Sequence, residues 1–234
     1  MVEKIIGILG GMGPEATADI YHRIILATPA QSDQEHIKTI IYSNPKIPDR
    51  TQGILGNAPS PVPLIVETAK ILENAGADFL IMPCNTAHYF IDKIQSEINV
   101  PILNMIKLAA DSILRNHSGV NTVGLLATDG TIKTRLYQNL FEAANLRVLT
   151  PDSENQEKTM KGIYSHIKSG GLAKGRELLL QTAEHLIDSG AEILVCGCTE
   201  ISLVIKNGDF IIPVVDPMQV IAEYAVEVAL GEKT

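Results

Sequence analysis

Short apolar runs alternate with segments of helical spacing along the whole chain. Eight runs rich in β-branched residues have the length of buried strands, at residues 4–9, 37–42, 79–82, 101–103, 122–126, 147–149, 193–195 and 211–215. Between most of them apolar positions recur every three or four residues, which predicts helices over residues 62–74, 131–144 and 172–188. This alternation is typical of βαβ units, so the pattern predicts an α/β protein with parallel sheets.

The chain also contains an internal repeat. Residues 69–84 align without gaps on residues 183–198, at a constant offset of 114 positions. Two shorter matches flank this one, pairing residues 7–9 with 124–126 and residues 101–104 with 213–216. We therefore expect two similar domains related by a pseudo-repeat, the first made of residues 1–100 plus 214–234 and the second of residues 101–213. The active site is expected in the cleft between them.

The repeat gives Cys84 and Cys198 equivalent positions, each just after a buried strand. Open parallel sheets bind ligands at that end of their strands. A lone buried cysteine is more often an inert core residue, but Asn85 and Thr86 are capping residues that leave backbone N–H groups free, an environment that favours a thiolate or a bound carboxylate.

Two equivalent thiols suit a particular reaction. Inversion of an α-carbon needs a base on one face and an acid on the other. A thiol with an ordinary pKa of about 8.5 can serve in either role near neutral pH. Cys84 and Cys198 therefore predict a two-base proton transfer.

A glycine-rich segment, Gly10-Gly11-Met12-Gly13-Pro14, follows the first strand. It fits the dinucleotide-binding pattern formally, but the second strand ends in Tyr-Ser-Asn, without the acidic residue that binds ribose, and no Gly-Lys-Ser/Thr follows. We interpret it as a tight strand-to-helix turn, with Pro14 near the first helical position and backbone N–H groups that could hold a carboxylate.

The third cysteine, Cys196, forms a C-x-C pair with Cys198. Such a pair could bind a metal or act as a redox couple, with His88 or Cys84 as further ligands, but it lacks the spacing of a structural zinc site. Cys196 lies within the strand pattern and is expected in the core. No metal site is predicted.

Composition narrows the possible partners and location. The 234 residues are 45% hydrophobic and 20% charged, and the net charge of −8 comes without any basic run, so nucleic acid is not an expected partner. No apolar segment is long enough to cross a membrane, no signal-peptide pattern is present, and three cysteines do not suit a disulfide framework. A cytoplasmic protein is expected.

Three motifs, in order, resemble those of the aspartate/glutamate racemase superfamily, in its aspartate racemase branch. They are Gly-Gly-Met-Gly-Pro-Glu-Ala-Thr from Gly10, Pro-Cys-Asn-Thr-Ala-His around Cys84, and Gly-Cys-Thr-Glu-Ile around Cys198. The resemblance covers essentially the whole chain. Glutamate racemases of cell-wall synthesis are less similar, since they open with a Ser-Asp-Ser-Gly type motif and follow the second cysteine with Thr-His.

The resemblance implies racemisation of aspartate without pyridoxal phosphate or any other cofactor, with Cys84 and Cys198 as the acid/base residues. It implies that Arg50 and Lys168 grip the substrate carboxylates, although Lys158 and Lys161 lie near Lys168 in the sequence. The implied substrate-binding set is Gly11, Met12, Arg50, Gln52, Asn85, Thr86, Thr128, Lys168, Thr199 and Glu200. A homodimer is implied, as is packing of residues 213–234 on the first half.

Other functions are compatible with the same residues. Glutamate or a broader range of amino acids is an alternative substrate. Maleate isomerase and hydantoin racemase are alternatives of the same fold, although Arg50 with Lys168 favours a free dicarboxylate over a hydantoin. The two cysteines argue against a one-thiol decarboxylase and against L-specific relatives that lack the first cysteine. A non-catalytic amino-acid-binding protein is the alternative from a different class.

Overall fold

The computed structural model describes residues 3–233, and these residues form two compact units. Unit 1 comprises the described residues up to Met105 and those from Met218 onward, and unit 2 comprises Ile106–Pro217. Each unit is an α/β structure with its own four-stranded parallel sheet. No helix within residues 3–233 combines the length and the apolar character that a membrane span requires.

The sheet of unit 1 has the strand order β2-β1-β3-β4. Its elements are β1 (Ile6–Gly10), α1 (Pro14–Ala27), the 3₁₀ turn η1 (Asp33–Glu35), β2 (Thr39–Ser43), α2 (Arg50–Leu55), α3 (Val62–Asn74), β3 (Phe79–Ile81), the 3₁₀ turn η2 (Thr86–Phe90), α4 (Ile91–Gln95), β4 (Ile102–Leu103) and, from Met218 onward, α11 (Pro217–Ala229). Strand β1 is central, with Ile8 paired to Ile41 of β2 and to Ile81 of β3.

Unit 2 repeats this order with β6-β5-β7-β8. Its elements are α5 (Met105–Asn116, from Ile106 onward), β5 (Thr122–Ala127), α6 (Asp129–Lys133), α7 (Gln138–Ala143), β6 (Arg147–Leu149), α8 (Ser153–Lys161), the π-helical turn η3 (Gly162–His166), the 3₁₀ turn η4 (Ile167–Ser169), α9 (Leu172–Asp188), β7 (Ile193–Gly197), α10 (Thr199–Val204) and β8 (Val214–Val215). Strands β5 and β7 therefore correspond to β1 and β3.

The duplication extends to individual contacts. Gly7 lies so close to its neighbours that a Cβ atom there would be 2.4 Å from Leu80 Cδ2, and Gly124 has the same relation to Leu194, at 2.8 Å. In both units only glycine lets the central strand approach the next strand this closely. The shared sheet order and these contacts confirm the internal repeat.

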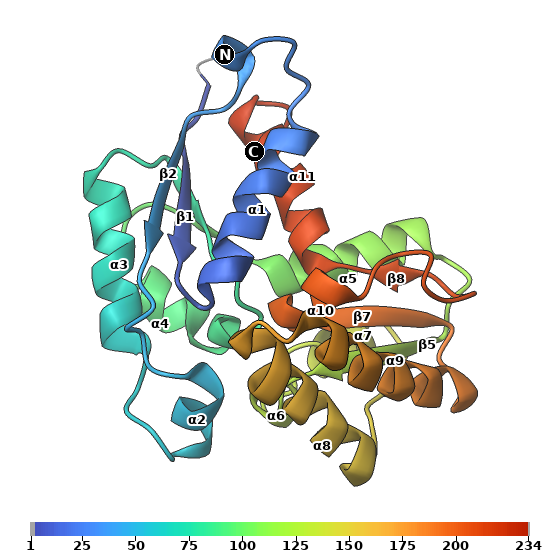
Figure 1. The fold of residues 1–234 in the computed structure, drawn as a ribbon. Helices are drawn as coiled ribbons and strands as arrows, with labels where there is room; N and C mark the ends of the chain where they lie inside the picture. Colours follow the sequence, from blue (N-terminus) through green and yellow to red (C-terminus); the bar gives the residue numbers. More distant parts are fainter. Residues whose placement is uncertain (1–2, 234) are drawn as a thin grey trace. The chain divides into compact units, whose positions relative to one another are not determined.

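Helices cover both faces of the sheet of unit 1. Helix α3 lies on one face and α1 on the other, with α11 beside α1 (Figure 1). The backbone N–H of Lys4 donates to the carbonyl of Ala229 at 3.0 Å, and Arg23 of α1 donates to Gln219 of α11 at 3.2 Å. The C-terminal helix thus belongs to the same compact unit as the N-terminal strand.

All eight expected strands are present, with small shifts at their ends. The helices at Val62–Asn74 and Leu172–Asp188 also match their expected bounds. The prediction of a single helix over residues 131–144 is wrong, because two separate helices, α6 and α7, lie there. Arg135 has a left-handed backbone conformation, with φ of 56°, which interrupts the helical pattern.

The boundary between the units differs from the one expected at residue 101. Strand β4 pairs with β3, and the carbonyl of Pro101 accepts a hydrogen bond from the N–H of Leu80 at 2.8 Å, so this segment completes the sheet of unit 1. Its counterpart in unit 2 is β8, where the carbonyl of Pro213 accepts from the N–H of Leu194 at 2.9 Å.

Candidate active site

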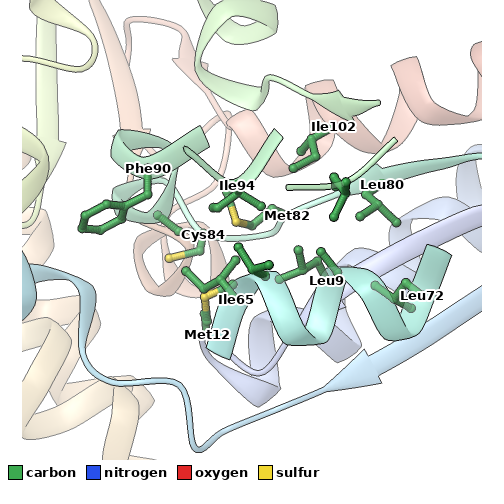
Figure 2. Close-up of a cluster of buried hydrophobic side chains, with 14 of the residues drawn as sticks. Leu9, Met12, Ile65, Leu72, Leu80, Met82, Cys84, Phe90, Ile94 and Ile102 are labelled. Carbon is green, nitrogen blue, oxygen red and sulfur yellow. The ribbon is translucent and has the colours of Figure 1, made fainter. Parts of the chain in front are cut away.

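Cys84 lies beyond the carboxyl end of β3, in the apolar core of unit 1. Its side chain is 6% exposed and belongs to the same buried cluster as Met12, Ile65 and Phe90 (Figure 2). Its flanking residues Asn85 and Thr86 are also buried. The thiol therefore lies among packed side chains at the carboxyl end of the strands, where parallel α/β proteins bind ligands.

His88 fixes the backbone of Cys84. Its Nδ1 lies 2.8 Å from the carbonyl oxygen of Cys84, while its Nε2 accepts a hydrogen bond from the N–H of Met105 at 3.2 Å. Complete burial lowers the pKa of His88 to about 4, so the ring is neutral at pH 7. Because Nε2 accepts, the proton must be on Nδ1, which then donates to Cys84. His88 lies in the Cys84 motif, but the sequence predicts for it only a possible metal-ligand role and not this contact.

The glycine-rich segment forms a close crossing of backbone segments. Gly11 has φ of +92°, and a Cβ atom there would be 2.2 Å from the carbonyl carbon of Asn44. Its N–H donates to Thr17 Oγ1 at 2.9 Å, and this hydroxyl donates to the carbonyl of Gly13 at 2.8 Å. Pro14 is the first residue of α1, as expected. The close approach to Asn44 explains why position 11 is a glycine, so the glycine need not indicate a nucleotide-binding site.

Arg50 is the first residue of α2 and only 8% exposed. Its guanidinium donates to the carbonyl of Pro48 at 3.2 Å, to that of Ile47 at 3.4 Å, and to that of Met12 at 3.3 Å. The last bond connects Arg50 to the core cluster that contains Cys84. Gln52 points elsewhere, since its side-chain oxygen accepts from Asn57 on the exposed side of α2.

Cys198 is the N-cap residue of α10 and is buried to the same degree as Cys84, at 6% exposed. Its Sγ donates to Glu200 Oε2 at 2.9 Å, and the hydroxyl of Thr199 donates to the same oxygen at 3.2 Å. The other carboxylate oxygen, Oε1, lies 3.5 Å from Lys168 Nζ. The thiol, the carboxylate and the ammonium group thus form a continuous polar chain.

The electrostatic surroundings hold Cys198 as a thiol. Burial raises its pKa well above the ordinary value, and the charge of Glu200 raises it further. Lys168 acts in the opposite direction, lowering that pKa, but its effect is smaller than those of burial and of the Glu200 charge. At neutral pH Cys198 therefore carries its proton.

The structure distinguishes the three candidate lysines. Lys158 pairs with Glu154 at 2.8 Å, and Lys161 is exposed at the end of α8. Lys168 lies in the separate turn η4, where its Nζ lies over the ring of Tyr164, 4.5 Å from the centroid, and reaches Glu200. Of the three, Lys168 has the contacts that lead to Cys198.

Thr128 and Cys196 are the other residues of unit 2 that the sequence singles out. Thr128 follows β5 and caps α6, accepting from the N–H of Thr131 at 3.3 Å. Cys196 lies within β7 and is fully buried in the core, as expected. The described part of the chain has no cluster of three or more His, Cys, Asp or Glu arranged for a metal.

Tyr137 is a feature that the sequence analysis missed. It is completely buried, and burial followed by the charges of Cys196, Asp216 and Cys198 raises its pKa well above the ordinary value. Its hydroxyl is therefore neutral. The apolar run around it offered no signal of this, because the contact depends on strands more than fifty positions away.

Each unit thus gathers its expected site residues at the carboxyl end of its own sheet. Unit 1 contributes Gly11, Met12, Arg50, Cys84, Asn85 and Thr86, with Gln52 turned aside. Unit 2 contributes Thr128, Lys168, Cys198, Thr199 and Glu200. In both units the cysteine follows the strand next to the central one, beyond β3 and β7 respectively.

Comparisons with known proteins identify relatives of the whole chain. The family described as "Asp/Glu/Hydantoin racemase" matches residues 9–225. A broad specificity amino-acid racemase of Bacillus subtilis, RacX, is 27% identical over 231 residues, covering 97% of this chain and 99% of that protein.

Solved structures give the same result. The aspartate racemase of Picrophilus torridus is 33% identical and superposes with a TM-score of 0.85, covering 97% of this chain and 94% of its own. The glutamate racemase of Francisella tularensis, solved with D-glutamate, has a TM-score of 0.72 at 18% identity, covering 98% and 82% of the two chains, and shares the fold.

Proposed function

Because this chain belongs to the Asp/Glu/hydantoin racemase family and is an amino-acid racemase of that fold, we propose that it interconverts L- and D-aspartate without a cofactor. Cys84 and Cys198 are the two acid/base residues of the proposal. The observation that supports this most directly is the duplication: two buried thiols follow equivalent strands of two sheets with the same strand order.

The proposed reaction moves one proton off the α-carbon and another onto it. One cysteine, as thiolate, removes the α-proton from one face and becomes a thiol, while the other cysteine, as thiol, delivers its proton to the opposite face and becomes a thiolate. The reverse reaction exchanges the roles. By resemblance to the family, Cys198 takes the proton from the L-enantiomer and Cys84 from the D-enantiomer.

Aspartate is the proposed substrate because two kinds of support agree. The Picrophilus enzyme, at 33% identity, is an aspartate racemase, and Arg50 and Lys168 offer two cations for two carboxylates. The Bacillus relative has broad specificity, which makes a wider substrate range the second candidate. Gly11, Met12, Asn85, Thr86, Thr128, Thr199 and Glu200 are the further proposed substrate-binding residues, together with Gln52.

The test is incubation of the purified protein with L-aspartate, L-glutamate and L-alanine in separate reactions, followed by chiral chromatography. The proposal expects D-aspartate as the fastest product, and activity that persists with EDTA and with hydroxylamine, a carbonyl reagent. Comparable rates on alanine would replace aspartate by a broad range of substrates. No product from any amino acid, with correctly folded protein, would remove the catalytic proposal.

Serine variants test the two thiols. A serine hydroxyl is too weakly acidic to replace a thiolate, so Cys84→Ser and Cys198→Ser should each lose racemisation. In D₂O, Cys84→Ser should still exchange the α-proton of L-aspartate with retention, and Cys198→Ser that of D-aspartate. Normal racemisation by either variant would falsify the two-thiol mechanism, while the opposite preference would reverse only the facial assignment.

The proposal includes a cytoplasmic homodimer. Light scattering on the purified protein should give twice the chain mass of 25.3 kDa, and cell fractionation should place the protein with cytoplasmic enzymes. A mass equal to one chain at micromolar concentration would contradict the dimer without affecting the chemistry.

A further inference from the structure

Two equivalent cysteines need not have equivalent surroundings, and the polar contacts of these two differ. Cys84 is fixed through its backbone carbonyl by His88, a neutral ring, whereas Cys198 is bound through its sulfur by a carboxylate. The sheet order and the burial of the two thiols are the same. The difference therefore comes from Glu200, two residues beyond Cys198.

We propose that Glu200 is a positioning residue that holds the proton of Cys198, so that this cysteine is the acid of the pair until the contact is released. The inference rests on the proposed function. Its geometry is the hydrogen bond from Cys198 Sγ to Glu200 Oε2, at 2.9 Å, inside the core of unit 2. In such a site the carboxylate accepts a hydrogen bond from the thiol, and its negative charge would repel a thiolate.

Lys168 is the third residue of this polar chain. Its Nζ lies 3.5 Å from Glu200 Oε1, and its positive charge opposes the repulsion that the carboxylate exerts on a Cys198 thiolate. Lys168 is partly exposed, whereas the Glu200 side chain is not. An anionic group that reaches Lys168 from solvent would therefore compete with Glu200 for the same cation.

Other polar groups near Cys198 act less directly. Those that face it or its partners are Thr199 on α10, Lys168 on η4, Tyr164 on η3, Cys196 on β7, Tyr137 between α6 and α7, and Asp216 after β8. Thr199 donates to the same oxygen of Glu200 and so supports its orientation. Asp216 accepts from Ser202 at 2.6 Å, and its charge acts on Tyr137.

The experiment measures alkylation of Cys198 by iodoacetamide as a function of pH, with fragmentation mass spectrometry to separate Cys198 from Cys196. In Glu200→Gln the Cys198 thiolate should form at lower pH, and alkylation at pH 7.5 should be about threefold to tenfold faster than in the wild type. One unit of pKa is tenfold in thiolate, and the lower nucleophilicity of a more acidic thiol offsets part of it.

Two further variants make the test decisive. Lys168→Met should change the rate in the opposite direction, with slower alkylation of Cys198, because the carboxylate is left without its counter-charge. Glu184→Gln removes an exposed carboxylate from α9 in the same unit and should leave the rate unchanged. Thermal unfolding establishes whether each variant is folded. If Glu200→Gln does not fold, the alkylation rate of Lys168→Met tests the proposal.

The kinetic counterpart is the basic limb of kcat/KM against pH, where the acid loses its proton, and Glu200→Gln should shift this limb to lower pH. Since the two enantiomers have equal free energy, the shift must be the same in both directions. An unchanged alkylation profile in Glu200→Gln, or equal effects of Glu200→Gln and Lys168→Met, would overturn the assignment of Glu200. If the protein shows these alkylation shifts but has no racemase activity, the role of Glu200 stands and only the proposed function is refuted.

Discussion

Acidification should expose the energetic cost of the neutral His88. The ring is completely buried, donates to the carbonyl of Cys84 and accepts from the N–H of Met105, so both nitrogens are in use only while the ring is neutral. Protonation would place a second donor beside the donor N–H of Met105, and the nearby carbonyls, including that of Leu103, offset the cost of burial only in part. We expect wild-type stability to fall as this group titrates, and His88→Gln to remove that part of the fall.

The sign and size follow from the pKa. Burial lowers the pKa of His88 to about 4 in the folded protein, against an ordinary value of 6.5 in the unfolded chain. Between these values the unfolded chain binds more protons, so the contribution is complete above about pH 6.5 and is lost as the pH falls towards 4. With roughly 1.4 kcal/mol for each pH unit, the loss is about 3 kcal/mol.

The assay is urea unfolding at pH 7 and at pH 4.5 for the wild type, for His88→Gln and for His22→Gln, a control at an exposed histidine of α1. Glutamine can donate to a carbonyl and accept from an N–H without titrating. Between pH 7 and pH 4.5, the free energy of unfolding of His88→Gln should therefore fall by about 2 to 3 kcal/mol less than that of the wild type. His22→Gln should follow the wild type. Equal pH dependence in all three proteins would refute the neutral, buried ring.

Three further outcomes are expected. Arg50→Lys keeps the charge but loses the forked guanidinium proposed to bind a substrate carboxylate, so KM for aspartate should rise by a factor corresponding to about 1.5 to 3 kcal/mol, and unchanged kinetics would show that Arg50 only binds the carbonyls of Ile47, Pro48 and Met12. Gly124→Ala places a Cβ 2.8 Å from Leu194 Cδ2 and should lower the free energy of unfolding by about 1 to 3 kcal/mol, whereas Gly119→Ala, in open space, should not. Cys196→Ser should racemise nearly normally yet unfold about 1 to 3 kcal/mol more easily, because it buries a hydroxyl in the core; a loss of activity in the folded variant would give Cys196 a catalytic role.

The strands and the repeat were predictable because their signals are local. A buried strand of a parallel sheet is a short apolar run, and β1, β3, β5 and β7 all have that form. The gap-free match of residues 69–84 to 183–198 was enough to place Cys84 and Cys198 at equivalent strand ends. Chain order alone gives these relations, since a helix, a glycine turn and a strand follow one another in both segments.

What only the tertiary structure decided depends on partners distant in sequence or on burial. The break at Arg135 lies within a helical pattern, and β4 belongs to unit 1 only because it pairs with β3. His88 is neutral because the core excludes water from both of its nitrogens, and Lys168 is distinguished from Lys158 by reaching a carboxylate on another element. Apolar periodicity reports which face of a segment is buried, but a proton's position depends on which polar groups are buried beside it.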